Sequence, residues 1–479
     1  MTNPATNMSA LDALFLHAED GKTHMHIGSC AVLAGPAPTM GELTALISSK
    51  LHLTHRFRQK VRQVPGGLGR PVWVDDPAFD LGYHVRHSAL PPPGSAQDLD
   101  NLMGRLMSQE LDRTRPLWEM WMIEGLPDGQ WALISKVHHC MVDGISGTDL
   151  MTALLDTTPN ATTAPAPVWQ PEPEPNDVRL VLDAVAGLIL APARQVASLV
   201  RSAGSPGNTL RHLHDTLAGA RSLGRRLIAP SAPLSIEGTI GSHRRWAVAR
   251  CTLAEAKAIR RVFGGSVNDV VLTAITAAFR NLLVQRGDVV EHATVSSLVP
   301  VSVRSGGDHT FNNQVSMMIA ALPVGIADPL DRLRAVTAGM AALKQSNQAT
   351  ASAAAFDVVD LMPPALFGAG VRAATTIMRR TPQRMINTVT TNVPGPPYPL
   401  FALGREMVEY LPFVPLSSGV RIGVAILSYN GRLAFGITGD YDSAPDVQTM
   451  AEGIEAAIAE LGELAASAAH AAGEGASPR

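Results

Sequence analysis

A proline-rich stretch divides this chain of 479 residues into two long parts. It covers residues 156–176 and has prolines at positions 159, 165, 167, 171, 173 and 175. Proline has no backbone N–H to donate and favours an extended chain, so the stretch is unsuited to a regular helix or a central strand. A single hydrophobic core rarely grows beyond about 250–300 residues. The stretch is therefore predicted to be a linker between two domains.

Both parts combine helical and strand periodicities, which predicts a mixed α/β fold class. In the first part, helices are expected over residues 9–18, 40–51, 96–111 and 147–155, and strands over 27–33, 71–74, 119–123 and 131–137. In the second part, helices are expected over 253–262, 268–285, 328–345 and 447–464, and strands over 295–303, 314–323, 420–427 and 433–439. Asn430-Gly431, between the last two strands, is typical of a type I′ hairpin turn.

These patterns give a predicted domain organisation. Residues 1–155 and 241–465 form the two domains. Residues 156–240 comprise the linker and a set of basic amphipathic helices, and an Ala/Gly/Ser-rich tail, residues 466–479, is expected to be disordered.

Residues 178–228 are apolar and basic. Seven arginines are accompanied by only Asp183 and Asp215, so the local charge is +7 − 2 = +5, whereas the whole chain carries −3. Basic amphipathic helices can lie in a bilayer interface, which would place the protein at the inner membrane face or on lipid droplets. The alternative is a helical connector that packs on its own protein and keeps its arginines solvated. The sequence leaves both interpretations open.

The composition excludes several functions. A net charge of −3 gives no clustered basic field for nucleic acid. Cys30, Cys140 and Cys251 are far apart, which argues against a disulfide framework or a zinc site. No Walker loop or G-x-G-x-x-G pattern is present, so no nucleotide cofactor is expected. The N-terminal residues lack a signal-peptide pattern and no run of about twenty apolar residues occurs, so a cytoplasmic protein is expected.

The clearest candidate for chemistry is the motif H-H-x-x-x-D-G at the end of the strand over 131–137. It consists of His138, His139, Asp143 and Gly144. Histidine titrates near neutral pH and is the usual general base. A metal site has no further ligand at suitable spacing, and a serine nucleophile lacks a G-x-S-x-G elbow. General-base catalysis on a hydroxyl group remains, beside the plainer interpretation that the histidines are structural.

Further motifs follow one another across nearly the whole chain. They are Ser9-Ala10-Leu11-Asp12-Ala13-Leu14-Phe15, Arg115-Pro116-Leu117-Trp118, Val267-Asn268-Asp269-Val270, Pro300-Val301-Ser302-Val303-Arg304, Asn313-Gln314-Val315-Ser316 and Thr391-Asn392-Val393-Pro394-Gly395-Pro396. With H-H-x-x-x-D-G, this ordered set resembles the bacterial wax ester synthase/diacylglycerol acyltransferase family of the CoA-dependent acyltransferase superfamily. The resemblance implies two chloramphenicol-acetyltransferase-like domains with an active-site tunnel at their interface.

By this resemblance, His139 is the general base that takes the proton of an acceptor alcohol as its oxygen attacks the acyl-CoA thioester. His138 either supports the reaction or only orders the loop. Asp143 is similar to a structural aspartate that pairs with an arginine, and Arg304 is the candidate partner. Gly144 supplies backbone freedom at the end of the motif.

The N-D motif of the family gives two more site residues. Asn268 either donates a hydrogen bond to the thioester oxygen as negative charge develops, or only caps the helix that begins there. Asp269 is expected to be structural. Pro116-Leu117-Trp118 and the motif around Asn392 are expected to shape the tunnel or the domain crossover, and Phe15 is expected to lie in the core.

The resemblance implies an O-acyltransferase that moves a long-chain acyl group from acyl-CoA to diacylglycerol, or to a fatty alcohol, with no cofactor. One alternative is another member of the superfamily, a condensation-type enzyme that uses acyl groups bound to a carrier protein. The other is a non-catalytic protein of the lipid-droplet surface, with residues 178–228 as its working part.

Overall fold

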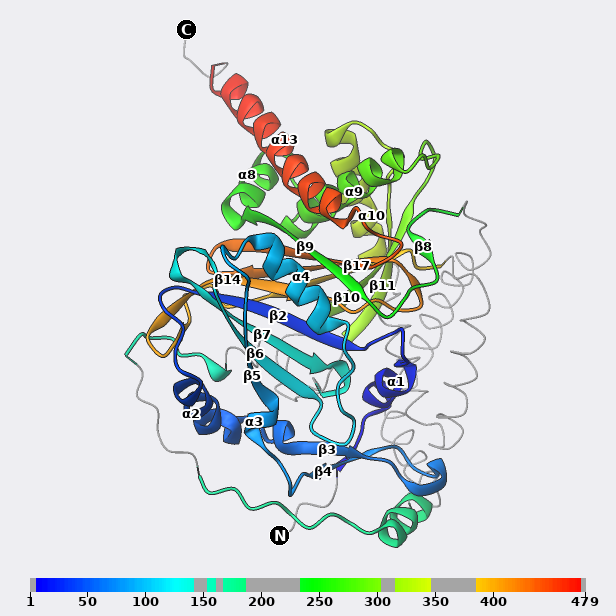
Figure 1. Cartoon of the computed structure of the whole chain (residues 1–479). Helices are drawn as coiled ribbons and strands as arrows, with labels where there is room; N and C mark the ends of the chain where they lie inside the picture. The colour runs from blue at the N-terminus through cyan, green and yellow to red at the C-terminus, as the bar shows by residue number, and fades with distance from the viewer. Residues whose placement is uncertain are drawn as a thin grey trace, which may run out of the picture.

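The structure is a computed structural model that describes residues 6–141, 153–160, 167–186, 233–302, 315–345 and 385–474. Within these ranges the chain forms two six-stranded sheets, one three-stranded sheet and one pair of short strands. Figure 1 shows the two large sheets stacked, with the helices of the second half covering the outer face of the upper sheet. The predicted mixed α/β fold class is confirmed.

The first large sheet has the order β13-β14-β2-β7-β6-β5. Its strands are β2 (His26–Leu33), β5 (Val85–Ala89), β6 (Trp118–Glu124), β7 (Trp131–His138), β13 (Phe401–Ala402) and β14 (Arg405–Phe413). All neighbouring strands are antiparallel except the parallel pair β5–β6. Two strands of this sheet, β13 and β14, thus come from the far end of the chain.

The second large sheet has the order β11-β10-β12-β16-β17-β9. Its strands are β9 (Arg244–Thr252), β10 (Val295–Ser302), β11 (Val315–Leu322), β12 (Thr388–Pro394), β16 (Ile422–Tyr429) and β17 (Arg432–Asp440). β12 runs parallel to β10 and β16, and the remaining pairs are antiparallel. The smaller sheets contain β1 (Thr6–Asn7), β3 (Gln59–Arg62), β4 (Val72–Asp75), β8 (Glu237–Gly238) and β15 (Gly419–Val420).

The helices cover the outer faces of the sheets and the contact between them. They are α1 (Ala10–Ala18), α2 (Met40–Lys50), α3 (Leu81–His84), α4 (Ala96–Met107), α8 (Leu253–Phe263), α9 (Val267–Gln285), α10 (Pro329–Gln345) and α13 (Val447–Glu474). Short 3-10 turns are η1 (Leu51–Leu53), η2 (His55–Arg58), η3 (Pro65–Gly67), η4 (Pro127–Gly129) and η5 (His139–Met141).

Helix α9 is the core helix of the second half. It packs with α10 and α13 on the second sheet in one large apolar cluster. By length and composition α9 is apolar enough to cross a bilayer, but 72% of its most apolar stretch is buried inside the protein. Burial against the sheet accounts for this apolarity without a membrane.

A separate apolar cluster joins the two halves. It combines one face of the first sheet and helix α4 with Trp246 and Val248 of β9 and Ala434 of β17. Helix α4 begins with a capping box, in which Ser95 and Asp98 satisfy each other's backbone N–H groups, and it turns Leu102 and its other buried residues toward this cluster. The halves are therefore packed on each other through apolar side chains.

Most of the predicted elements within the described residues are present. The hairpin between β16 and β17 turns at Asn430 and Gly431, which both have positive φ (44° and 80°), as the predicted type I′ turn requires. One prediction is wrong: helix α13 continues to Glu474 through residues predicted as a disordered tail. Alanine is the strongest helix former, so the alanine-rich segment extends the helix instead of ending it. The predicted helix at 147–155 lies largely outside the described residues.

Candidate active site

The two adjacent histidines lie where β7 ends. The strand stops at His138, and the turn η5 begins at His139. The backbone N–H of His138 donates to the carbonyl of Leu117 (2.9 Å), and the backbone N–H of His139 donates to the carbonyl of Met25 (2.7 Å). Because Leu117 leads into β6 and Met25 leads into β2, both neighbouring strands fix the position of the pair.

His139 is covered on one face by an aromatic ring. Its imidazole stacks on the phenyl ring of Phe15 of α1, with ring centroids 3.8 Å apart and planes 20° apart. Phe15 packs against the core of the first half, as predicted. Burial is the largest cause and lowers the pKa of His139, a backbone hydrogen bond opposes it, and the neighbouring His138 adds a smaller lowering, so that the pKa falls to about 4. The imidazole is therefore neutral at pH 7 and able to accept a proton.

His138 is fully buried. Its Nδ1 accepts a hydrogen bond from the backbone N–H of Cys140 (3.1 Å). An imidazole nitrogen that accepts a hydrogen bond carries no proton, so in the neutral ring the proton is on Nε2. That atom lies 3.4 Å from a carboxylate oxygen of Glu19. These contacts favour an ordering role over a chemical one for His138.

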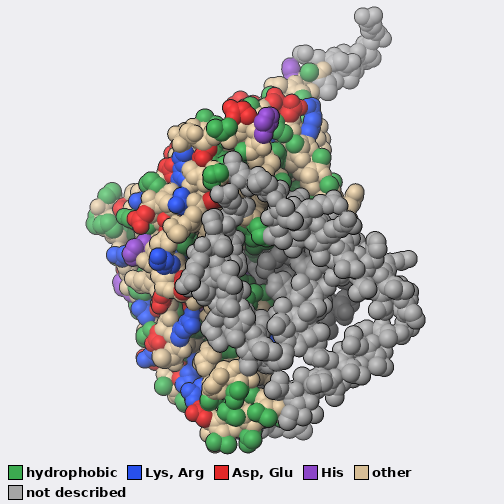
Figure 2. Space-filling model, turned by 90° about the vertical axis from the view of Figure 1, so that its right-hand side faces the viewer, with side chains coloured by type: hydrophobic (Ala, Val, Ile, Leu, Met, Phe, Trp, Pro, Cys, Tyr) green, Lys and Arg blue, Asp and Glu red, His purple; other side chains and the backbone are tan. Residues whose placement is uncertain are grey.

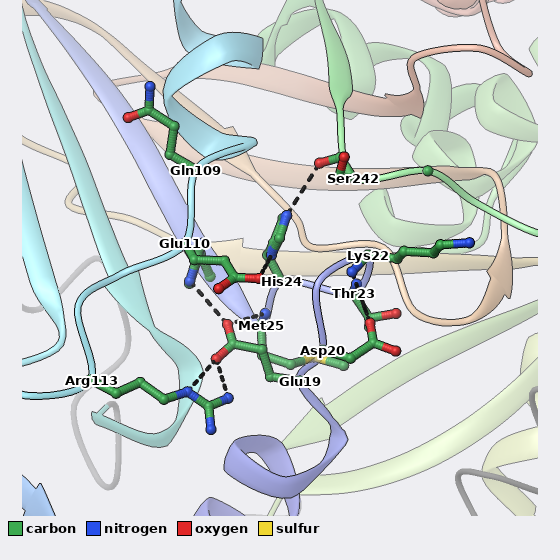
Figure 3. A network of polar contacts seen from close by, with 12 residues as sticks. Glu19, Asp20, Lys22, Thr23, His24, Met25, Gln109, Glu110, Arg113 and Ser242 are labelled. Atoms are coloured by element: carbon green, nitrogen blue, oxygen red, sulfur yellow. Dashed lines mark hydrogen bonds and ion pairs between the residues drawn. The ribbon is translucent and has the colours of Figure 1, made fainter.

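Glu19 is the centre of a buried polar network at this end of the sheet (Figure 3). It follows α1 as the C-cap residue, and its side chain is 6% exposed. Arg113 donates to one carboxylate oxygen through Nε (3.2 Å) and Nη2 (2.5 Å), and the backbone N–H of Met25 donates to the other (3.3 Å). Nε2 of His26 lies 3.1 Å from the same oxygen as the Met25 N–H.

A buried lysine supports the strand that carries the motif. The ammonium group of Lys136, fully buried in β7, donates to the carbonyl oxygens of Leu106 (3.0 Å) and Gln109 at the end of α4. Burial lowers the pKa of Lys136 to about 8, against the attraction of Glu119. The lysine therefore acts as a C-terminal cap that ties α4 to the strand ending at His138.

The N-D motif begins helix α9 in the second half. Ser266, not Asn268, is the N-cap: Asp269 N–H donates to the Ser266 hydroxyl (3.2 Å) and Ser266 N–H donates to the Asp269 carboxylate (2.8 Å). The expected structural role of Asp269 is thus a capping box. The amide oxygen of Asn268 accepts a hydrogen bond from Asn392 of β12 (3.0 Å). Among the described contacts, the amide N–H groups of Asn268 have no acceptor, so they are free to donate to a ligand.

Three predicted site residues, Asp143, Gly144 and Arg304, lie outside the described residues. The proposed pair of Asp143 and Arg304 therefore stays a prediction. The described part of the chain brings His138 and His139 together on the first half and places Asn268 and Asp269 on the second.

Sequence reasoning missed the network behind the histidines. Glu19 and His26 belong to no recognised motif, and Arg113 reaches Glu19 across 94 residues of sequence. The available signal was indirect: Glu19 directly follows the helix that carries Phe15. Within the described residues, no group of three or more His, Cys, Asp or Glu side chains has the geometry of a metal site.

Two family models match the chain. Residues 8–271 match the wax ester synthase/diacylglycerol acyltransferase catalytic domain, and residues 311–462 match the C-terminal domain of the same family. A probable diacylglycerol O-acyltransferase of Mycobacterium tuberculosis is 38% identical over 468 residues, which cover 95% of each chain. A putative diacylglycerol O-acyltransferase of Mycobacterium bovis matches to the same extent.

Solved structures with a similar fold extend this picture. The wax ester synthase/diacylglycerol acyltransferase of Marinobacter aquaeolei VT8 has a TM-score of 0.67 and 26% identity, and covers 96% of this chain and 100% of its own. The first condensation domain of the CDA synthetase has a TM-score of 0.59 at 15% identity, and covers 96% of each chain. That second likeness concerns the fold alone; together with the Marinobacter structure it confirms the predicted fold of two related halves.

Proposed function

Because the chain belongs to the wax ester synthase/diacylglycerol acyltransferase family, we propose that it transfers a long-chain acyl group from acyl-CoA to diacylglycerol. The product is triacylglycerol. A fatty alcohol is the alternative acceptor and gives a wax ester. The relatives of similar length that are named diacylglycerol O-acyltransferases favour the first acceptor.

In this proposal His139 is the general base. Its neutral imidazole takes the proton of the acceptor hydroxyl as the oxygen attacks the thioester carbonyl carbon. The carbon–sulfur bond then breaks, and the proton passes to the CoA thiolate, so that free CoA and the ester leave together. The observation that carries the proposal is the position of His139 at the end of β7 with its ring stacked on Phe15. Its pKa, lowered to about 4 mainly by desolvation, is consistent with a ring that is unprotonated at pH 7.

The second half contributes a hydrogen-bond donor in this scheme. The thioester oxygen gains negative charge in the tetrahedral state, and a donor aimed at it lowers the barrier. Asn268 fits this role because its amide oxygen is engaged by Asn392, which leaves the NH2 group to donate. The balance of atoms needs no cofactor: acyl-CoA is a co-substrate, and no electron transfer takes place.

The test is His139→Ala in purified protein supplied with palmitoyl-CoA and either diolein or hexadecanol. Loss of the base is expected to lower kcat by about 10²–10⁴-fold, without unfolding the protein. His87→Ala is the matched control, because His87 is an exposed histidine that pairs with Glu124 (2.9 Å) on β6. Near-wild-type ester formation by His139→Ala would refute the mechanism, and acyl transfer only from a carrier protein would favour the condensation-type alternative.

We also propose that the enzyme is cytoplasmic and docks peripherally on a membrane or lipid droplet through residues 178–228. The described start of this segment is a helix over 177–186. Leu180 anchors it against the small β3–β4 sheet, while Val178 and Leu182 are 68% and 63% exposed. Figure 2 shows hydrophobic side chains gathered at the lower end of the molecule, where Figure 1 places this helix. An exposed apolar face next to basic residues suits an anionic lipid surface.

Vesicle co-sedimentation tests this docking. Leu182→Glu is expected to weaken binding to anionic vesicles and to leave the fold intact, because the side chain is exposed. Unchanged binding would refute a role for the described helix.

A further inference from the structure

We propose that Glu19 is a positioning residue for catalysis: its buried carboxylate orients His138 and thereby fixes the turn that presents His139. This inference rests on the proposed role of His139 as the base. It assigns to Glu19, which belongs to no motif of the sequence, a function in the reaction without contact to substrate.

The first step of the argument is the fixed position of the carboxylate. Both oxygens are engaged, one by the guanidinium of Arg113 and the other by the backbone N–H of Met25 (Figure 3). Arg113 is half exposed, so it neutralises the carboxylate from the solvent side. Burial by itself would raise the pKa of Glu19, but its contacts with His138 and His26 outweigh this and hold the pKa well below its usual range. Glu19 is therefore a fixed anion inside the protein.

The second step is the tautomer of His138. Nδ1 must be unprotonated to accept the Cys140 N–H, so in the neutral ring the proton is on Nε2, which lies 3.4 Å from a carboxylate oxygen of Glu19. This is an electrostatic contact between a buried N–H and a carboxylate, not an aligned hydrogen bond. A carboxylate behind an imidazole selects the tautomer with the proton on the facing nitrogen, and it limits rotation of the ring. If the proton moved to Nδ1, that N–H would oppose the N–H of Cys140, and the turn would lose the hydrogen bond that closes it.

The third step links this turn to the base. His139 lies between His138 and Cys140, inside the turn that the Nδ1 contact closes. Its backbone N–H is held by the Met25 carbonyl, while Glu19 holds the Met25 N–H. Glu19 thus affects the position of His139 in two ways. It contacts the ring of His138, whose Nδ1 closes the turn, and it holds the N–H of Met25, whose carbonyl accepts the His139 N–H.

The fourth step is that one helix contacts both histidines. Helix α1 places Phe15 against the His139 ring, and Glu19, at its C-cap, against His138. The side chain of Glu19 has no capping role in the helix, because the cap bond is made by its backbone N–H to the carbonyl of Phe15. With no capping task, the buried carboxylate is satisfied by Arg113 and the Met25 N–H, and it presents its charge to the ring of His138.

The central variant is Glu19→Gln, which keeps the shape and removes the charge. A misplaced base slows the chemical step more than substrate binding, so we expect kcat to fall by about 10–100-fold while KM stays within about 2-fold. Glu19→Asp restores the charge and is expected to recover part of kcat. The matched control is Glu110→Gln in the same cluster, where the carboxylate is 60% exposed and 3.9 Å from His24, and kcat should not change.

A second readout does not depend on activity. In protein labelled with 15N-histidine, the shifts of His138, assigned with His138→Gln, should report an Nε2–H tautomer that is lost or mixed in Glu19→Gln. An unchanged tautomer, or a wild-type kcat in a Glu19→Gln protein whose Tm alone has fallen, would overturn the proposal. If Glu19→Gln fails to fold, Arg113→Gln at the half-exposed end of the same contact takes its place, with a smaller change in the same two readouts. Full activity of His139→Ala would instead overturn the proposed mechanism, and the tautomer measurement would still decide the role of Glu19.

Discussion

At the scale of single residues, two adjacent histidines differ because of the groups around their rings. His138 has one ring nitrogen bound by a backbone N–H and the other facing Glu19. His139 has a phenyl ring on one face and a pKa of about 4, set mainly by burial. The two adjacent histidines therefore have different surroundings: the ring of His138 holds the turn, and the ring of His139 is the one that we propose transfers the proton. The depressed pKa makes His139 a weaker base, but it ensures that nearly all molecules carry the neutral ring at pH 7.

The pH dependence of kcat/KM tests this difference. A base with a pKa of about 4 is neutral above that value and becomes protonated as the pH falls through it. Activity is expected to stay flat from about pH 8 to about pH 5 and to fall below, in protein shown by circular dichroism to remain folded. Phe15→Ala admits water to the ring and should move the fall toward about 6.5, the ordinary histidine value, whereas Phe15→Leu keeps the apolar cover and should not. A fall near 6.5 in the wild-type protein would contradict a His139 whose pKa is lowered to about 4.

At the scale of elements, the start of α9 separates two functions within one motif. Asp269 closes a capping box with Ser266, whereas Asn268, one residue earlier, directs its amide to Asn392 on β12. Asp269 thus fixes the start of the helix, and the adjacent Asn268 is the residue that we propose donates its amide N–H to the thioester oxygen. The second role depends on a strand that lies 124 residues away in sequence.

Substitution of the two residues should therefore give opposite results. Asp269→Ala loses the capping box and is expected to lower the free energy of unfolding by about 1 kcal/mol in urea titrations. Asn268→Ala leaves the cap intact and is expected to change stability by less than about 0.5 kcal/mol but to lower kcat by about 10²-fold. A stable, fully active Asn268→Ala protein would leave the amide with no role in the reaction.

The sequence predicted elements well where local chemistry decides them. The turn at Asn430 and Gly431 and the strand before His138 follow from residue type and alternation over a few positions. Family motifs pointed to His139 and Asn268. The network around Glu19 was not predictable in this way, because its partners come from α1, β2 and the segment after α4, and no local pattern reports which distant strands pair. Strand β14 was missed for the same reason: its partner β2 belongs to the other half of the chain.

At the scale of the whole molecule, a strand from the second half joins the sheet of the first half, and buried polar contacts also connect the two halves. Strand β14 of the second half pairs with β2 of the first, from Met407 opposite Leu33 to Phe413 opposite Gly28. Arg244, 4% exposed, donates to the carbonyl oxygen of Lys22 and thus ties the start of β9 to the segment before β2. The contact of Arg244 with Lys22 lies in the same segment, between α1 and β2, as Met25, whose N–H is held by Glu19, so the packing of the halves and the placement of His139 involve the same segment.

The contact between β14 and β17 makes this packing testable at one glycine. A Cβ on Gly436 of β17 would lie 1.7 Å from the carbonyl oxygen of Pro412 of β14, an oxygen that accepts a hydrogen bond from the indole of Trp246 (3.1 Å). Neither backbone can give way without separating the two sheets. Gly436→Ala is therefore expected to destabilise the protein by about 1–3 kcal/mol, as overpacking of a core does, and to lower activity as the halves part.

Gly462→Ala in α13 is the matched control. A Cβ there meets no atom within 4 Å, and alanine favours a helix by about 0.5–1 kcal/mol over glycine, so this variant should be as stable as wild type or more so. Thermal unfolding followed by circular dichroism, with activity at 25 °C measured on the same samples, gives both readouts. A Gly436→Ala protein with unchanged Tm and activity would mean that the halves do not hold each other through this contact. Loss of activity at a temperature where the far-ultraviolet signal is still native would instead show that catalysis needs the halves in register, beyond the folding of either one.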